Sequence, residues 1–451
     1  MLDQQTLLVI GGTAAGLSAA SKAKRLNPAL KVTVFEKTGY ISYGACGLPY
    51  FVGGLIDEPE DLVAVSVEEM IGKRDIQVLI HTQVISIDRD KKSVVARALH
   101  SGEETTYRYT FLVIATGATP IIPAIEGLKA QGVCVLRTVE DGIHMKALAR
   151  QSSRICIIGG GFIGLELAEE LTRLHKKITL VEALDRLLPM LPTSFSNLVK
   201  QTLESRGVEV RLGSTIRKIV EEGGMVTSVI DADHTSIAAD MVVLSVGVRP
   251  SSSLGADAGL LLGFKDGIVV DDQQRSSDKA IWACGDCVQM HHMITKKPTH
   301  VPLGTTANKM GRVAGSVIGG ESARFPGVLG SQVTKVFDLY IAATGLSFDE
   351  AIKEGYAAQQ ASITKSDKAS YYPGGRQNHI NLVFEEKSGR LLGAQAVGSE
   401  SVAGRINTLV ACITAGFTLA QINSLDLVYA PPVAPVYDPI LIAANQAMKL
   451  L

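Results

Sequence analysis

A single cysteine, Cys46, stands in a run of small and aromatic residues, 39–50, that contains no charged side chain. Ser42 and Gly44 can leave backbone N–H donors free at the start of a short helix, and Pro49 is tolerated only in such a first turn. A helix N-terminus favours an anion and lowers the pKa of a thiol, and the thiolate is the reactive form. These residues predict a reactive thiol; the alternative is a small, buried hydrophobic side chain.

A glycine-rich turn precedes this cysteine. An apolar run of the buried parallel-strand type, 7–10, leads directly into residues 11–16, GGTAAG. The next predicted strand, 31–35, ends in Glu36. A tight glycine turn, a helix N-terminus for phosphates and a carboxylate for a ribose hydroxyl predict a dinucleotide-binding fold, although Thr13 replaces the second glycine of the usual motif.

A second and more complete copy of this pattern follows. The apolar run 154–158 leads into residues 159–164, GGGFIG, and the next predicted strand, 177–181, ends in Glu182. A carboxylate at this position binds a 2′-hydroxyl and repels a 2′-phosphate, so it favours NADH over NADPH, whereas the nearby Arg186 acts against that preference. Two such folds predict two dinucleotides, one of them a flavin.

Further apolar runs return to the ligand-binding edge of each predicted sheet. Residues 111–117, 241–247 and 280–286 each end in small residues, as expected of strands whose carboxyl ends face a ligand, and the last run ends in Asp286. That run also begins a C-x-x-C pair, 284–287, which supplies only half of a structural zinc site. We therefore predict no metal there.

Composition limits the possible partners and the cellular location. With 451 residues the chain is long enough for two or three domains, and its net charge of −1 gives no reason to expect a nucleic acid or an anionic membrane as partner. No uncharged apolar run approaches 18 residues, and six cysteines in a chain of this length do not form a secreted disulfide framework. The first predicted strand leaves no room for a signal peptide. We predict a soluble, cytoplasmic protein.

The pattern changes near Phe325, after which short alternating runs are mixed with a helix at about 402–415. The chain closes with Tyr-Ala-Pro-Pro at 429–432 and a last helix from about Pro439. This mixture predicts an α+β domain with an antiparallel sheet. The fold class is therefore α/β, with two Rossmann-like dinucleotide-binding domains followed by a C-terminal α+β domain.

These motifs resemble the flavin-dependent pyridine nucleotide-disulfide oxidoreductases over nearly the whole chain, and more narrowly the coenzyme A disulfide reductases. The resemblance implies FAD on the first fold, NADH or NADPH on the second, coenzyme A as part of the substrate, and a homodimer built by the C-terminal domain. The implied domains are 1–118 and 250–324 for FAD binding, 119–249 for NAD(P)H binding, and 325–451 for dimerisation.

The same resemblance implies the cofactor contacts. By this likeness Asp286 holds the flavin ribityl chain and Glu166 lies near the nicotinamide. The contacts expected at the first fold are Gly11, Thr13, Ala14, Ala15, Gly16, Glu36, Lys37, Val84, Ala115, Thr116, Gly117, Asp286 and Ala307. Those expected at the second are Gly159, Gly161, Phe162, Ile163, Gly164, Glu166, Glu182 and Gly247.

Cysteine spacing sets this chain apart from members of the family with a C-x-x-x-x-C dithiol. Position 51 is Phe51, and the next cysteine is Cys134, so the redox centre is one thiol with an external partner: a mixed disulfide, a persulfide or a sulfenic acid. NADH oxidases and peroxidases, which use a sulfenic acid, carry a histidine where this chain has Ala14. Coenzyme A disulfide reductases often have Asn where this chain has Ala45.

The phosphates of coenzyme A need cations. Lys22 and Arg25 share a face of the first predicted helix, with Ser18 one turn earlier. In the family this face lines the coenzyme A groove; the alternative is a solvated basic surface. With Ser42 near the cysteine, and with His300 placed in the substrate cleft by the resemblance, these residues form the predicted substrate contacts.

Two tyrosines, Tyr429 and Tyr372, are the predicted proton donors. A leaving thiolate needs a donor, and a tyrosine hydroxyl beside a rigid proline segment can supply it. In the family this tail crosses the dimer interface to the partner's cysteine; the alternative is a packing role.

We predict a homodimeric FAD enzyme that reduces coenzyme A disulfide, persulfide or polysulfide. The alternatives are an NADH oxidase or peroxidase with a Cys46 sulfenic acid, or a redox sensor or electron carrier with low turnover.

Overall fold

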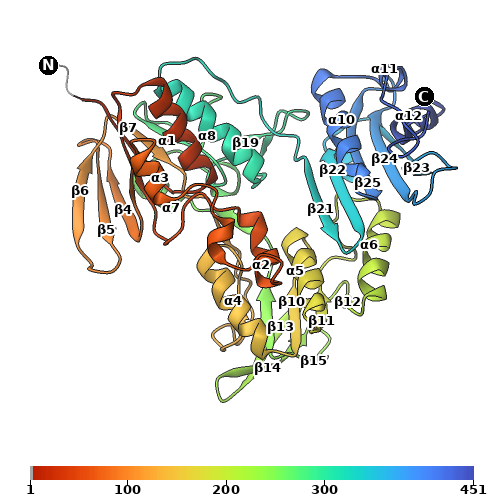
Figure 1. The fold of residues 1–451 in the computed structure, drawn as a ribbon, viewed down its shortest axis with the longest axis horizontal. Helices are drawn as coiled ribbons and strands as arrows, with labels where there is room; N and C mark the ends of the chain where they lie inside the picture. The colour runs from red at the N-terminus through yellow and green to blue at the C-terminus, as the bar shows by residue number, and fades with distance from the viewer. Residues whose placement is uncertain (1–3) are drawn as a thin grey trace.

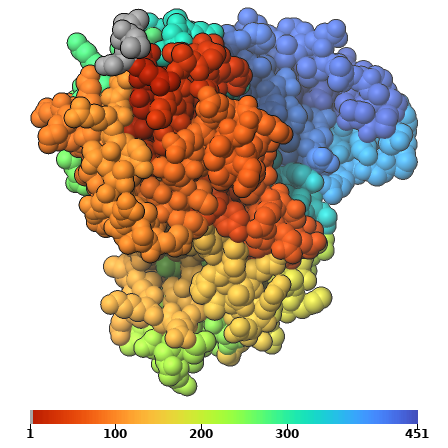
Figure 2. All heavy atoms as spheres, turned by 60° about the vertical axis from the view of Figure 1, so that its left-hand side comes forward, coloured from red at the N-terminus to blue at the C-terminus, as the bar shows by residue number. Residues whose placement is uncertain are grey.

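The computed structural model describes residues 4–451, which form three units (Figure 1). The first unit contains the N-terminus and a later return of the chain, the second unit (yellow to green) is inserted between these two parts, and the third (blue) contains the C-terminus. Figure 2 shows the first unit (orange) resting directly on the second (yellow).

The first unit is built on a parallel sheet with the strand order β18-β7-β1-β2-β3. Its strands are short and almost wholly apolar because both faces of the sheet are covered. The elements that precede the second unit are β1 (Thr6–Ile10), α1 (Ala14–Leu26), β2 (Lys31–Phe35), α3 (Val67–Gly72), β3 (Gln77–Leu79), β4 (Thr82–Asp88), β5 (Ser93–Ala98), β6 (Glu104–Arg108) and β7 (Phe111–Ile114). Those that follow it are α7 (Ser253–Asp257), β18 (Ile281–Ala283), β19 (Met290–His291), β20 (Pro298–Thr299) and α8 (Gly304–Ile318).

Helices α1 and α8 pack side by side on this sheet and run in the same direction (Figure 1). Gly311 and Gly315 of α8 permit the close approach, because a Cβ at Gly311 would lie 2.1 Å from the Ala15 carbonyl oxygen and one at Gly315 would lie 2.4 Å from that of Ala19. Both helices therefore present their N-termini at the same edge of the sheet, where backbone N–H groups favour phosphates.

The second unit repeats the plan with the parallel order β12-β11-β10-β16-β9. Its elements are β9 (Val133–Cys134), α4 (Val139–Gln151), β10 (Arg154–Ile158), α5 (Phe162–Arg173), β11 (Lys177–Val181), α6 (Thr193–Ser205), β12 (Glu209–Arg211), β13 (Ile216–Glu222), β14 (Met225–Asp231), β15 (Ser236–Ala238) and β16 (Met241–Leu244). Strands β8 (Ala118–Pro120) and β17 (Val248–Pro250) pair with each other where the chain enters and leaves this unit. We propose the domain boundaries 118/119 and 249/250.

The third unit has an antiparallel five-stranded sheet of order β21-β22-β25-β24-β23. Its elements are β21 (Gln332–Val336), β22 (Leu339–Gly345), α9 (Phe348–Lys353), β23 (Ala358–Ser366), β24 (Gln377–Glu385), β25 (Leu391–Gly398), α10 (Ser401–Ala415), α11 (Leu419–Asn423) and α12 (Pro439–Met448). The predicted fold class is confirmed: two Rossmann-like sheets are followed by a C-terminal α+β unit. The small antiparallel sheets β4–β6 and β13–β15 were not predicted. Within residues 4–451 no helix is long and apolar enough to cross a membrane.

Candidate active site

The two glycine turns have the same backbone geometry. Gly11 has a φ of +111°, and a Cβ there would lie 2.2 Å from the Ala115 carbonyl oxygen. Gly159 has a φ of +110°, and a Cβ there would lie 2.5 Å from the Ser245 carbonyl oxygen. Both positions therefore require glycine, since any side chain would meet the loop that follows the neighbouring strand.

The two glutamates that follow are held in the same way. One carboxylate oxygen of Glu36 accepts a hydrogen bond from the Gly12 N–H at 2.7 Å, and one of Glu182 accepts from the Gly160 N–H at 2.7 Å. Each carboxylate is thus fixed beside the N-terminal turn of a helix, where a ribose hydroxyl is recognised in dinucleotide folds. A Cβ at Gly161 would meet no atom within 4 Å, which leaves open space for a ligand. Both turns fit a dinucleotide.

Three further predicted cofactor contacts differ in exposure. Val84 and Ala307 are buried, and Lys37 is exposed. Asp286 follows β18, and its carboxylate accepts a hydrogen bond from the Arg137 guanidinium at 2.9 Å. The His300 ring donates its Nε2–H to the Asp286 backbone oxygen at 2.8 Å, so His300 lies at the same edge of the sheet.

Cys46 lies in a short 3₁₀ turn, Ala45–Gly47, that runs into α2 (Leu48–Val52), with Pro49 in the first turn as predicted. The preceding loop is tied to the first glycine turn, because the Ser42 N–H donates to the Gly12 carbonyl oxygen at 2.9 Å. Cys46 is exposed, whereas the other five cysteines are buried. The thiol is therefore the accessible one of the six.

The expectation of a lowered pKa for this thiol is wrong for the isolated chain. Although the side chain reaches solvent, surrounding protein atoms desolvate the thiol and raise the pKa of Cys46 above its ordinary value. The Glu166 carboxylate raises this pKa further, while the Arg137 guanidinium opposes the rise. Helix α2 has only five residues, so its N-terminus offers little compensation.

Glu166 reaches the cysteine from the second unit. It lies in α5, and one of its carboxylate oxygens accepts a hydrogen bond from the Thr334 hydroxyl of β21 at 2.7 Å. Burial raises the pKa of Glu166, and the neighbouring carboxylate of Glu169 adds to the effect. The predicted nicotinamide-side residue and the predicted nucleophile are therefore close enough for their charges to interact.

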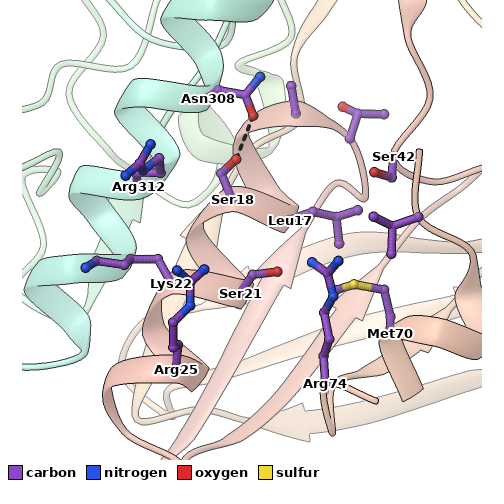
Figure 3. A pocket seen from close by; sticks show the side chains of 13 residues that line it. Leu17, Ser18, Ser21, Lys22, Arg25, Ser42, Met70, Arg74, Asn308 and Arg312 are labelled. Atoms are coloured by element: carbon purple, nitrogen blue, oxygen red, sulfur yellow. Dashed lines mark hydrogen bonds between the residues drawn. The ribbon is translucent and has the colours of Figure 1, made fainter. Parts of the chain in front are cut away.

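A groove of about 360 Å³ lies between α1, α8 and α3 (Figure 3). It brings together four of the five predicted substrate contacts, Ser18, Lys22, Arg25 and Ser42, but not His300. Ser42 lies in the loop that carries Cys46. Its lining residues are Thr13, Ala14, Leu17, Ser18, Ser21, Lys22, Arg25, Ser42, Val65, Met70, Arg74, Asn308 and Arg312. Sequence reasoning missed Arg74, which follows α3, and Arg312, which the packing of α8 against α1 brings to the groove.

The four cations of this groove have different partners. Lys22 forms an ion pair with Glu321 at 2.7 Å, and Arg74 forms one with Glu69 at 2.9 Å. Across residues 4–451, Arg25 and Arg312 are engaged in no ion pair. Figure 3 shows their side chains on neighbouring helices, α1 and α8. These two guanidinium groups are available to an anionic ligand.

The predicted tyrosines do not pair with each other. The hydroxyl of Tyr429 forms a hydrogen bond with the hydroxyl of Tyr371 at 2.9 Å, and both side chains are exposed. Tyr372 lies beside Lys368, whose ammonium is 5.7 Å from the ring centre. Tyr371 was missed because its partner is 58 residues away in sequence and no local motif marks it.

Comparisons with known proteins agree with this arrangement. The model of the pyridine nucleotide-disulphide oxidoreductases matches residues 5–311, and that of their dimerisation domain matches residues 331–438. An NAD(P)H coenzyme A polysulfide/persulfide reductase of Pyrococcus horikoshii is 38% identical over 447 residues, 98% of each chain. An NADH oxidase of Methanocaldococcus jannaschii is 34% identical, over 98% of this chain and 99% of the relative.

A solved structure extends this similarity to three dimensions. The NAD-dependent persulfide reductase from A. fulgidus has a TM-score of 0.96 at 39% identity, and the match covers 99% of this chain and 83% of that one. The family uses FAD and NAD(P)H, for which the two glycine turns provide matching sites. The chain belongs to the pyridine nucleotide-disulphide oxidoreductase family and carries its dimerisation domain.

Proposed function

We propose that this flavoenzyme is a homodimer that reduces the sulfur–sulfur bond of coenzyme A persulfide, polysulfide or disulfide through Cys46. The observation that carries this proposal is the position of the one exposed cysteine, in a loop that also lines a cation-rich groove at Ser42. Relatives named as coenzyme A-linked sulfur reductases support the choice of substrate. The cytoplasmic location and the absence of a nucleic acid partner remain predictions.

The chemistry needs only one protein thiol. FAD, when bound, passes the electron pair of the pyridine nucleotide to the sulfur centre. The Cys46 thiolate attacks the substrate sulfur–sulfur bond, so that a Cys46 mixed disulfide forms and a thiolate leaves. Two electrons then cleave the mixed disulfide, which restores the Cys46 thiolate and releases the second thiolate. Each departing thiolate takes up one proton.

The groove suits a ligand with several phosphates. Arg25 and Arg312 form no ion pair with any carboxylate of the described residues 4–451, and arginine binds phosphate with two parallel hydrogen bonds. Lys22 is less available than predicted, because Glu321 already neutralises it. We therefore assign the main phosphate contacts to the two arginines and a secondary one to Lys22, with the thiol end of the ligand directed toward Ser42.

The leaving thiolate would be protonated by the partner subunit through Tyr429. Large hydrophobic side chains close to Tyr429 in the chain, or in the segment that contacts it, are exposed in the third unit, which suits an interface within the matched dimerisation domain. These exposed residues are Tyr371, Tyr372, Val428, Tyr429, Val433, Val436 and Tyr437.

Mixing Cys46→Ser with Tyr429→Phe protomers tests Tyr429 as the proton donor, since partial recovery of activity requires a site shared between subunits. Heterodimers that stay inactive would place Tyr429 outside the partner's site.

The test of the proposed function is NADH oxidation with coenzyme A disulfide or persulfide under anaerobic conditions. We expect turnover by the wild type, whereas Cys46→Ser should retain FAD and its reduction by NADH but lose sulfur reduction. Near-normal turnover by the serine variant would show that Cys46 takes no part in the chemistry.

Rapid oxygen uptake with NADH alone would favour an oxidase instead, an alternative supported by the relatives named NADH oxidases. Slow turnover with every acceptor, despite a flavin that NADH reduces, would favour a sensor or carrier.

A further inference from the structure

The second glycine turn lies beside a cation that a different unit holds in place. Arg186 belongs to the loop after β11, and its guanidinium forms an ion pair with the Asp349 carboxylate of α9 at 2.7 Å. A second contact, to the Thr193 hydroxyl at 3.3 Å, fixes the same guanidinium. Arg186 is therefore directed toward the third unit.

This loop also packs against the second glycine turn. A Cβ at Gly160 would lie 2.5 Å from a side-chain carbon of Leu187 and 3.3 Å from a carboxylate oxygen of Glu182. Leu187, next to Arg186 in sequence, thus packs against the turn whose Gly160 N–H holds Glu182. A guanidinium released from Asp349 would lie in the same short loop as Glu182.

The neighbouring cation at this edge is also neutralised. Arg211, at the end of β12, pairs with Glu209 at 2.7 Å, and its backbone oxygen accepts a hydrogen bond from the Glu182 N–H at 2.8 Å. Arg186 and Arg211 are thus both paired with carboxylates, while the Glu182 carboxylate is held at the glycine turn by the Gly160 and Leu184 N–H groups. Of these two arginines, neither presents an unpaired guanidinium to a 2′-phosphate beside Glu182.

We propose that Asp349 determines nucleotide specificity by holding Arg186 away from the position of a 2′-phosphate. NADPH is then disfavoured by Glu182, which repels the phosphate, and by Asp349, which removes the cation that could bind it. The residue acts through Arg186 and is a positioning residue. This inference rests on the family's use of pyridine nucleotides and is independent of the electron acceptor.

The energetic scale of the effect follows from exposure. The Asp349 side chain is 67% exposed, so the pair is of the surface type, and its removal should leave the fold intact. Release of Arg186 should accordingly raise affinity for a 2′-phosphate by about fivefold. Asp349→Glu preserves the charge and should retain the native selectivity.

The experiment measures binding of adenosine 2′,5′-bisphosphate and of adenosine 5′-monophosphate to the holoenzyme by calorimetry. Asp349→Asn should strengthen binding of the bisphosphate about fivefold and leave the monophosphate unchanged. The ratio of kcat/KM for NADPH to that for NADH should rise by a similar factor. In the Arg186→Ala background, Asp349→Asn should have no effect.

A matched control is Asp338→Asn. This carboxylate is also exposed and also joins the third unit to the second, through an ion pair with Arg206 at 2.5 Å. It should not alter bisphosphate binding. The proposal is overturned if Asp349→Asn leaves bisphosphate affinity unchanged, if the gain persists without Arg186, or if Asp338→Asn gives the same gain.

Discussion

The two dinucleotide folds share their turn geometry but differ in how closed they are. Glu36 is only 7% exposed, whereas Glu182 is half-buried, and near the second turn Ile163 and Leu184 are 40% and 48% exposed. The carboxylate at the first turn is thus more enclosed than the carboxylate at the second. This difference predicts that the first fold holds its dinucleotide more tightly than the second.

The largest effect is expected from replacing the equivalent glycines of the two turns, Gly16 and Gly164, by alanine. A Cβ at Gly16 would lie 1.9 Å from the Gly11 carbonyl oxygen, and one at Gly164 would lie 2.1 Å from that of Gly159. Gly16→Ala should give protein without flavin and a loss of several kcal/mol in the free energy of unfolding. Gly164→Ala should retain flavin but fail to be reduced by NADH. Flavin absorbance per protein, Tm and stopped-flow reduction check this. Equal flavin loss in both variants would contradict the division of labour.

A smaller effect is expected at the second carboxylate. Glu182→Gln should remove a charge-assisted hydrogen bond to the ribose and lower the preference for NADH over NADPH by about 1–3 kcal/mol, or roughly 5- to 150-fold in the ratio of kcat/KM values. Glu36→Gln, the matched change in the first fold, should weaken FAD retention and leave the preference unchanged. A native-like NADH preference in Glu182→Gln would assign specificity elsewhere in the pocket.

The smallest effect concerns Cys46, which lies where the two units meet. Burial and the Glu166 carboxylate raise the pKa of the thiol, so its alkylation in the reduced enzyme should accelerate as the pH rises beyond the ordinary cysteine value of about 8.5. Glu166→Gln removes a nearby negative charge and should displace this profile to lower pH. Glu170→Gln, the same change one turn further along α5, is the control, because Glu170 is not among the groups that shift the pKa of Cys46. Identical profiles for Glu166→Gln and the wild type would exclude the coupling.

Local patterns in the sequence were sufficient to predict most of the fold. Each glycine turn and its glutamate are close in sequence, and their spacing predicts the strand–turn–helix that the structure contains. The short sheets β4–β6 and β13–β15 went unpredicted because their strands are only partly buried and give a weak alternating pattern.

The site could be predicted only as far as neighbours along the chain define it. Ser18, Lys22 and Arg25 share a helix face and reach one groove as expected. Arg312 joins them only because glycines bring α8 against α1, and Asp349 reaches Arg186 across 163 residues. The pKa of Cys46 was predicted with the wrong sign, since its desolvation depends on packing between units.

The most direct test of the central claim is the intact mass of the enzyme after exposure to coenzyme A disulfide. Because Cys46 is the one exposed thiol, the account predicts a single added coenzyme A per subunit, located on Cys46 by peptide mapping and removed by one equivalent of NADH. Cys46→Ser should gain no mass. An adduct on another cysteine, or on none while coenzyme A disulfide is still turned over, would contradict the single-thiol mechanism.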